Sequence, residues 1–164
     1  MYLINIKIIK KNMLQSYKRL EKELKYFNGD DCEEDYMAGP IDEENIYLWS
    51  ACFQGPKNSP YEGGTFEVQI EFPKDYPYLP PRVEFITKVY HLNVKKGTGM
   101  VRLNLLKDDW SPDTKLINIL KAIQNLLAVP NIAQPLDKEA AKQYIENKEA
   151  YDATAKEWTE KYAQ

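Results

Sequence analysis

The segment TFEVQIEF at residues 65–72 limits most strongly what this chain can fold into. Apolar and polar side chains alternate along it: Phe66, Val68, Ile70 and Phe72 against Thr65, Glu67, Gln69 and Glu71. A period of two places each set on its own face of a β-strand, so that one face is buried and the other meets water. The segment therefore predicts a strand in a sheet that is covered on one side.

The stretch PKDYPYLPP at residues 73–81 ends that strand. Proline has no amide donor and fixes its own backbone angle, which excludes the stretch from a helix interior or a central strand. Other strand-like segments lie at residues 36–41, 46–53 and 82–87. The links between the four are too short for the crossovers that parallel strands need. An antiparallel four-stranded meander is the predicted sheet.

Helical periodicity flanks these strand segments. Residues 16–27 place apolar side chains three or four positions apart, and residues 113–128 do the same. Residues 137–164 contain one or two further helices, and the stretch between residues 88 and 112 is irregular. A helix, four strands, an irregular segment and then helices make a single α+β domain.

The first fourteen residues do not fit this domain. They are apolar but interrupted by Lys7, Lys10 and Lys11, so the stretch is too short and too charged to span a bilayer. We interpret residues 1–14 as an N-terminal extension and residues 15–164 as the domain. The chain has 164 residues, 43% of them hydrophobic, which is enough for one core. No membrane partner is expected.

Charge and cysteine content narrow the function classes. Lys and Arg number 22 against 25 Asp and Glu, and no basic block stands out, so nucleic acid is not an expected partner. Two cysteines are too few for a disulfide framework, which favours an intracellular location, cytoplasmic and/or nuclear. The sequence shows no phosphate-binding loop and no metal-ligand cluster, so neither a cofactor nor a metal is expected.

Nine features in the same order carry a resemblance to a known family. After the N-terminal helix they are AGP, WSACFQGP, SPYEGGTF, FPKDYPYLPP, YHLN, LNLLKDDWSP, PNIAQPL and EWTEKYA. In order and spacing the chain resembles the ubiquitin-conjugating enzymes, from about Gln15 to the C-terminus. The resemblance implies their fold and a thioester shuttle. In that shuttle a cysteine receives ubiquitin or a similar modifier from an activating enzyme, and a ligase presents the lysine that attacks the thioester.

The resemblance places Arg102 where the family carries its catalytic cysteine. The run Gly99-Met100-Val101-Arg102-Leu103 matches the pattern that holds the nucleophile, with one more residue in the preceding loop. A guanidinium cannot form a thioester. As written, the chain therefore lacks the nucleophile.

Other site residues follow from the same resemblance. Asn93 corresponds to a proposed oxyanion and loop-supporting residue, and Tyr90 and His91 are kept as well. Asn104 stands where many members carry aspartate, and Gln134 matches an acidic or hydroxyl residue near the approach of the lysine. From the residues alone, His91 is better explained as a hydrogen-bonded turn histidine and Asn93 as loop scaffolding.

Ligase-contact positions implied by the resemblance lie elsewhere in the chain. Six residues match them: Lys18, Lys22, Tyr78, Ser111, Pro112 and Asp113. Each also has a plain structural explanation, since lysines solvate a helix, prolines shape loops, and a Ser-Pro pair starts a helix. Asp113 replaces the small residue that is usual there.

Neither cysteine is expected to replace the missing nucleophile. Cys52 lies in a strand segment, where burial raises the pKa of a thiol. Cys32 lies among acidic residues, whose negative field disfavours a thiolate.

Three function hypotheses remain. The first is a ubiquitin-conjugating-enzyme-like protein without thioester transfer, which binds a modifier, a RING-type or HECT-type ligase, an activating enzyme or an active conjugating enzyme. The second is an active conjugating enzyme whose cysteine is substituted at Arg102. The third is an unrelated small α+β enzyme or scaffold, which no motif supports. Changes at Leu92 (the proline of His-Pro-Asn), Asn104 and Gln134 favour the first, because one substitution at position 102 does not explain them.

Overall fold

The computed structural model describes residues 2–42 and 44–164, with side chains from Met13 onward within these ranges. Helix α1 (Tyr2–Phe27) is followed by four strands: β1 (Tyr36–Asp42), β2 (Asn45–Gln54), β3 (Thr65–Glu71) and β4 (Arg82–Phe85). The remaining elements are the short 3-10 helix η1 (Asn104–Leu106) and helices α2 (Leu116–Ala128), α3 (Lys138–Glu146) and α4 (Lys148–Tyr162). The predicted α+β class is confirmed.

The four strands form one antiparallel sheet in the order β1-β2-β3-β4, as predicted. Register aligns the buried positions, so that Val68 of β3 pairs with Ala51 of β2 and Phe85 of β4. Strand β4 ends two residues earlier than the sequence predicted. The amides of Ile86 and Thr87 both donate to the carbonyl of Glu67, at 2.9 and 3.2 Å, and this ends the regular ladder.

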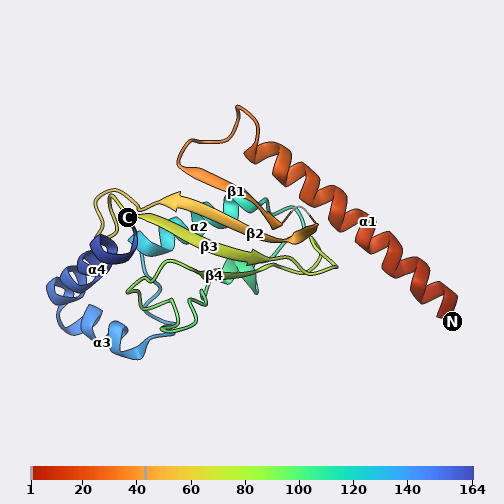
Figure 1. Ribbon diagram of the computed structural model, residues 1–164. Helices are drawn as coiled ribbons and strands as arrows, with labels where there is room; N and C mark the ends of the chain where they lie inside the picture. The colour runs from red at the N-terminus through yellow and green to blue at the C-terminus, as the bar shows by residue number, and fades with distance from the viewer. Residues whose placement is uncertain (1, 43) are drawn as a thin grey trace.

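The core lies between the apolar face of the sheet and helix α2, which crosses behind the sheet in Figure 1. Seven residues of α2 are buried: Leu116, Ile117, Ile119, Leu120, Ile123, Leu126 and Leu127. Polar contacts fix α2 at the edge of this face. Tyr36 of β1 donates to Gln124 Oε1 at 2.7 Å, and Gln124 Nε2 donates to the Gln54 carbonyl at 2.8 Å.

Helix α1 is longer than the sequence predicted. It begins at Tyr2 and continues without a break to Phe27, because no proline or glycine interrupts this stretch. Its N-terminal part projects past the sheet (Figure 1). Residues 2–14 thus continue α1, Met1 lies outside the described residues, and a domain boundary at 14/15 stays a prediction.

The C-terminal region forms two helices, α3 and α4, at the end of the sheet away from the N-terminus (Figure 1). Asn147 separates them, because it ends α3 and its side chain accepts the Ala150 amide at the start of α4. Asp137 caps α3 in the same way. Among the described residues, no helix is both long and apolar enough to cross a membrane.

Candidate functional site around Arg102

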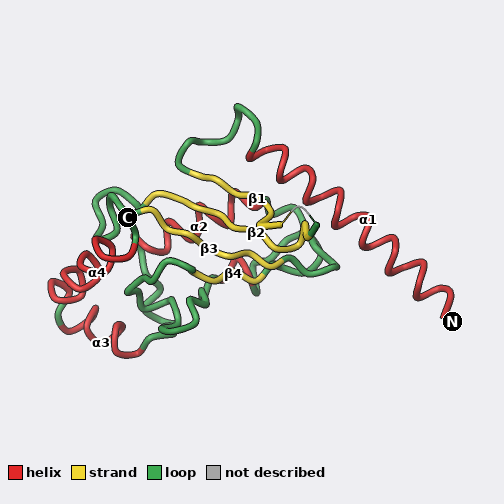
Figure 2. Tube along the Cα trace, viewed as in Figure 1, coloured by secondary structure: helices red, strands yellow, loops and turns green. Residues whose placement is uncertain are grey.

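The stretch between β4 and α2 is mostly loop (Figure 2). Within it a narrow loop connects Asn93 to Arg102. Val94 pairs with Val101, and the Lys95 amide donates to the Met100 carbonyl at 2.9 Å. Gly99 closes the loop with a φ of 72°. A Cβ there would lie 2.1 Å from the Phe85 carbonyl oxygen, so this position requires glycine.

Arg102 is half-buried, and its backbone amide donates to the Asn93 carbonyl at 3.0 Å. Within the described residues, its guanidinium forms no ion pair and no hydrogen bond. A side chain of this type rests its stem on apolar surface and keeps its charge in water. The position therefore holds a cation with five donors and offers no nucleophile.

Asn93 is fully buried and braces the site with its whole side-chain amide. Nδ2 donates to the carbonyls of Asn131 at 2.8 Å and Gln134 at 3.2 Å, and Oδ1 accepts the Asn131 amide at 2.8 Å. Both hydrogens of Nδ2 are thus engaged by backbone. In this arrangement Asn93 supports the 131–134 loop and has no free donor for an oxyanion.

His91 is buried below the loop, with 2% of its surface exposed. Its Nδ1 accepts the Asn93 amide at 3.0 Å, so the neutral ring carries its proton on Nε2, which has no hydrogen-bond partner within the described residues. Burial lowers the pKa of His91 to about 4, and the backbone of Leu126 acts weakly in the opposite direction. The imidazole is therefore neutral at physiological pH.

Leu92 and Tyr90 flank this histidine and are held by α3 and the segment before it. Leu92 is fully buried, and its carbonyl accepts the amides of Leu136 at 2.7 Å and Asp137 at 3.0 Å. The Tyr90 hydroxyl donates to Gln143 Oε1. Burial raises the pKa of Tyr90, and the nearby acidic side chains add to the effect. Both residues thus anchor the segment around His91.

The side chains of Asn104 and Gln134 are both exposed. Asn104 begins η1, and its carbonyl accepts the amides of Lys107 at 2.8 Å and Asp109 at 3.2 Å. Gln134 touches Asn93 only through its backbone carbonyl. Both side chains are neutral amides, and an amide is no general base. The structure brings Arg102, Asn93 and Gln134 together through backbone contacts.

The six ligase-contact positions are all exposed and lie apart from this network. Tyr78 has 56% of its surface exposed in the loop after β3, while Lys18 and Lys22 lie on the outer face of α1. The loop Ser111–Asp113 is held by a turn in which the Thr114 amide donates to the Ser111 carbonyl at 2.9 Å.

Arg19 and Glu23 link these three segments, and sequence reasoning did not single them out. Arg19 donates to the carbonyls of Pro112 at 2.6 Å and Thr114 at 2.7 Å, and its Nε donates to Glu23 Oε1 at 2.8 Å. Glu23 Oε2 accepts the Leu116 amide at 3.2 Å. One sequence signal could have found the pair, because Glu23 shares the apolar stripe of α1 with Leu20.

Further contacts join the loop after β3 to Arg19, Glu23 and Trp110. The Tyr76 hydroxyl donates to Glu23 Oε1 at 3.4 Å, and the Arg19 guanidinium lies 5.4 Å from the centre of the Tyr76 ring. Trp110 Nε1 donates to the Pro77 carbonyl at 2.9 Å. The segments that carry Lys18, Tyr78 and Ser111 are therefore held in a fixed arrangement.

Both cysteines are free thiols in half-buried positions. Burial raises the pKa of Cys52, and the negative charge of Glu67, its pairing partner on β3, raises this pKa further. Burial is also the larger cause of the raised pKa of Cys32, ahead of the charge of Glu33. Neither thiol is disposed to ionise at neutral pH. No cluster of His, Cys, Asp or Glu that could hold a metal ion occurs among the described residues.

Comparisons with known proteins agree with this architecture. The family model for ubiquitin-conjugating enzymes matches residues 19–159. The E2 domain of a Toxoplasma gondii ubiquitin conjugating enzyme is 39% identical and superposes with a TM-score of 0.83, over 90% of this chain and 99% of that chain. A Plasmodium yoelii structure described as a ubiquitin conjugating enzyme is also 39% identical, with a TM-score of 0.84, over 91% of this chain and 96% of that chain. The chain belongs to the ubiquitin-conjugating enzyme family.

Proposed function

We propose that this chain is a member of the family without thioester transfer, which acts in ubiquitin or ubiquitin-like modification by non-covalent binding. One observation carries the proposal. Arg102 occupies the position that the family resemblance gives to the catalytic cysteine, and a guanidinium cannot accept the modifier as a thioester. The unrelated-enzyme hypothesis is excluded by the family match.

The other thiols support this proposal, because neither has the surroundings of a nucleophile. The Cys32 thiol contacts the carbonyls of Glu33 and Tyr36 at 3.6 and 3.5 Å, and Cys52 stands between β1 and β3 in the middle of the sheet. Reactive cysteines need a positive environment that lowers the pKa, whereas the pKa of each of these thiols is raised.

The neighbours of Arg102 support the same conclusion. Asn93 is fully engaged with the 131–134 loop, and Asn104 and Gln134 present neutral amides where the resemblance implies acidic or hydroxyl residues. A transferase site needs a group that accepts the proton of the attacking lysine. These three residues supply none.

The partners follow from the exposed face. Lys18, Lys22, Tyr78 and the loop Ser111–Asp113 remain available to a ligase of the RING or HECT type. A modifier, an activating enzyme or an active conjugating enzyme is the other class of partner, and the expected location is the cytoplasm and/or the nucleus. No cofactor enters the proposal.

A second function has one observation in its favour. Among the described residues, the hydrogen bond that Arg102 forms runs from its backbone amide to the Asn93 carbonyl, and a cysteine at that position would keep this bond. The chain would then be an active ubiquitin-conjugating enzyme whose nucleophile is substituted at position 102.

A charging assay tests whether the chain can form a thioester with ubiquitin. The chain is incubated with activating enzyme, ATP and ubiquitin, and the products are resolved with and without a reductant. We expect no reductant-sensitive adduct, while a RING or HECT ligase is still bound in a pull-down that loses signal with Tyr78→Ala. A thioester band on the unchanged chain would overturn the proposal.

The Arg102→Cys variant separates the two functions further. If it is charged but does not pass ubiquitin to lysine, the amides at Asn104 and Gln134 limit transfer on their own, which supports the first function. If it is charged and discharges at the rate of an active family member, the second function is correct. Arg102→Ser is the matched control, because an oxygen ester resists the thiol reductants that cleave a thioester.

A further inference from the structure

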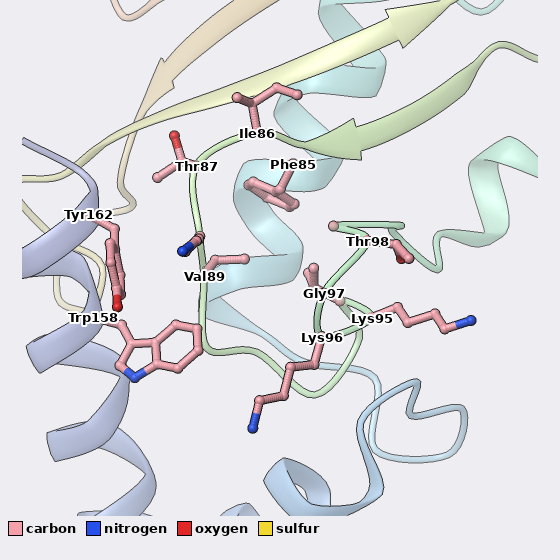
Figure 3. Close-up of a pocket in the computed structure, with 13 residues that line it drawn as sticks. Phe85, Ile86, Thr87, Val89, Lys95, Lys96, Gly97, Thr98, Trp158 and Tyr162 are labelled. Carbon is pink, nitrogen blue, oxygen red and sulfur yellow. The ribbon is translucent and has the colours of Figure 1, made fainter.

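A cavity of about 340 Å³ lies between α4 and the loop that leads to Arg102 (Figure 3). Phe85 and Val94 are buried residues at its apolar side. Trp158 and Tyr162 of α4 form the opposite wall and face the 94–99 loop across the opening (Figure 3). The cavity is large enough for one large side chain of a ligand and has aromatic surface to contact it.

The charge around this cavity has a single sign. Among the described residues that line it, three are lysines, Lys88, Lys95 and Lys96, and none is Asp or Glu. In the part of the chain whose side chains are described, none of the three forms an ion pair. Lys88 Nζ lies 5.3 Å from the centre of the Tyr162 ring. The positive charge at the cavity is therefore uncompensated.

Free hydrogen-bond donors line the cavity. The Thr87 and Thr98 hydroxyls already accept the amides of Glu67 at 2.8 Å and Met100 at 3.4 Å. By contrast, no hydrogen bond engages Trp158 Nε1 or the Tyr162 hydroxyl among the described residues. An indole N–H and ammonium groups donate only, so the cavity suits a ligand that supplies acceptors.

We propose that this cavity binds an acidic peptide segment of a protein partner. An aromatic or large apolar side chain of the segment fills the space against Trp158, and carboxylates on either side meet Lys88 and Lys96. Charge complementarity favours this occupant. A nucleic acid suits the surface poorly, because the chain carries a net charge of −3 and three lysines neutralise only a short stretch of phosphates.

This binding site is separate from the ligase-contact face and does not depend on chemistry at Arg102. Its lysines lie on the stretch after β4 and on the loop between Asn93 and Arg102, whereas the ligase-contact positions lie on α1 and the loops near it. A bound peptide would lie beside the loop that carries the extra residue before Arg102. Binding there goes beyond the proposed function, because it adds a partner that the family position of Arg102 does not imply.

The test uses the full chain and three blocked pentapeptides. The first has a central phenylalanine with two acidic residues on each side, the second replaces phenylalanine by alanine, and the third replaces the acids by lysines. Of the three tryptophans, Trp158 lines the cavity, whereas Trp49 is fully buried and Trp110 lies against Pro77, so a change of tryptophan fluorescence on binding is assigned to the cavity. We expect saturable binding of the first peptide and at least about tenfold weaker binding of the other two, a difference of about 1.4 kcal/mol each.

Charge-reversal variants place the peptide on the molecule. Lys88→Glu combined with Lys96→Glu changes two exposed side chains, so the fold is expected to persist, and binding should weaken by about tenfold or more. Lys156→Glu is the control, because this lysine is on α4 but lines a different cavity. Calorimetry repeats the measurement without relying on fluorescence.

Three outcomes would overturn the proposal. The first is that the acidic phenylalanine peptide does not bind by either method. The second is that the alanine peptide binds equally well, which would leave a non-specific ionic contact. The third is that Lys156→Glu weakens binding as much as the double reversal does, which would place the peptide elsewhere. Weak binding that falls with added salt and requires both phenylalanine and the two lysines supports the proposal.

Discussion

Two hydrogen-bond networks hold the loops of this molecule, and we call them the Glu23 bracket and the Asn93 bracket. The first contains buried charged groups, whereas the second contains only neutral groups. Around Glu23, a carboxylate joins α1, the loop after β3 and the start of α2. Around Asn93, a carboxamide and the His91 imidazole join the Arg102 segment to the 131–134 loop. The first bracket supports the positions that the family resemblance implies for ligase contact, and the second supports the place where the resemblance puts the nucleophile.

The two brackets differ in whether the charged groups in or beside them have ion-pair partners. Both ions of the Glu23 bracket have partners, since Arg19 meets the carboxylate and two backbone carbonyls. The Asn93 bracket contains no ion at all, and the cation beside it, Arg102, has no partner among the described residues. An ion pair holds the two segments that carry it in a fixed relative position. An unpaired, half-buried cation can instead bind an anion or water.

Removing the carboxylate of the charged bracket should have the largest effect. In Glu23→Ala, the Arg19 guanidinium, the Tyr76 hydroxyl and the Leu116 amide lose their partner at a position with 4% exposure. Breaking a buried ion pair in this way costs about 3 to 5 kcal/mol. The measurement is the free energy of unfolding in urea.

The control for this variant is Glu21→Ala on the exposed face of the same helix. Its effect should stay within about 0.5 kcal/mol, as for other surface substitutions. A loss below about 1 kcal/mol for Glu23→Ala would show that the buried Arg19–Glu23 ion pair does not stabilise the fold as proposed.

Acid should weaken the neutral bracket through His91. Its pKa is lowered to about 4 from an ordinary value of 6.5, so between these pH values the unfolded chain binds a proton that the folded chain excludes. The stability that this exclusion reflects is present above about pH 6.5 and is lost as pH falls towards 4, by about 3 kcal/mol in total.

The measurement compares the free energies of unfolding of the unchanged chain and of His91→Gln as the pH is lowered from about 7.5 to about 4. Titration of carboxylates is common to both proteins, so the difference in slope belongs to His91. Equal slopes in the two proteins would contradict a buried neutral imidazole.

Asn93→Ala should have the smallest of the three effects on stability. It removes three hydrogen bonds from the 131–134 loop but leaves no buried charge, so the expected loss is about 2 kcal/mol. Hydrogen exchange at the Asn131 amide should accelerate, because that amide donates to Asn93 Oδ1. Asn104→Ala, at an exposed position, is the control and should leave both readouts unchanged.

Local patterns predicted the scaffold well because each depends on nearby residues only. The alternation at residues 65–72 became β3, the short links gave an antiparallel sheet, and the stripe at 113–128 became α2. The helical conformation of the N-terminal extension was not predicted. Its lysines and mixed apolar residues argued against a membrane span but do not oppose a helix, and α1 runs through them.

The candidate site was only partly accessible to sequence reasoning. The family pattern located Arg102 and its neighbours, but it could not show that the amide of Asn93 is engaged by backbone groups some forty residues away. Arg19 and Glu23 escaped notice because charged side chains on a helix usually lie in water. The cavity beside Trp158 was also missed, since its lysines and aromatic residues come from three separated segments.

The sequence by itself determined the α+β order, the antiparallel sheet, the family and the identity of the side chain at position 102. These follow from periodicity, link length and motif spacing, which a one-dimensional pattern contains. The tertiary structure decided which polar groups meet: Glu23 with Arg19, Asn93 with Asn131, and Arg102 with no partner among the described residues. The reason is that desolvation and pairing depend on what the folded chain brings within hydrogen-bond distance. Asn93 and Asn131 are distant in sequence, and Arg19 and Glu23, although neighbours on one helix face, lose their water only once the helix has packed.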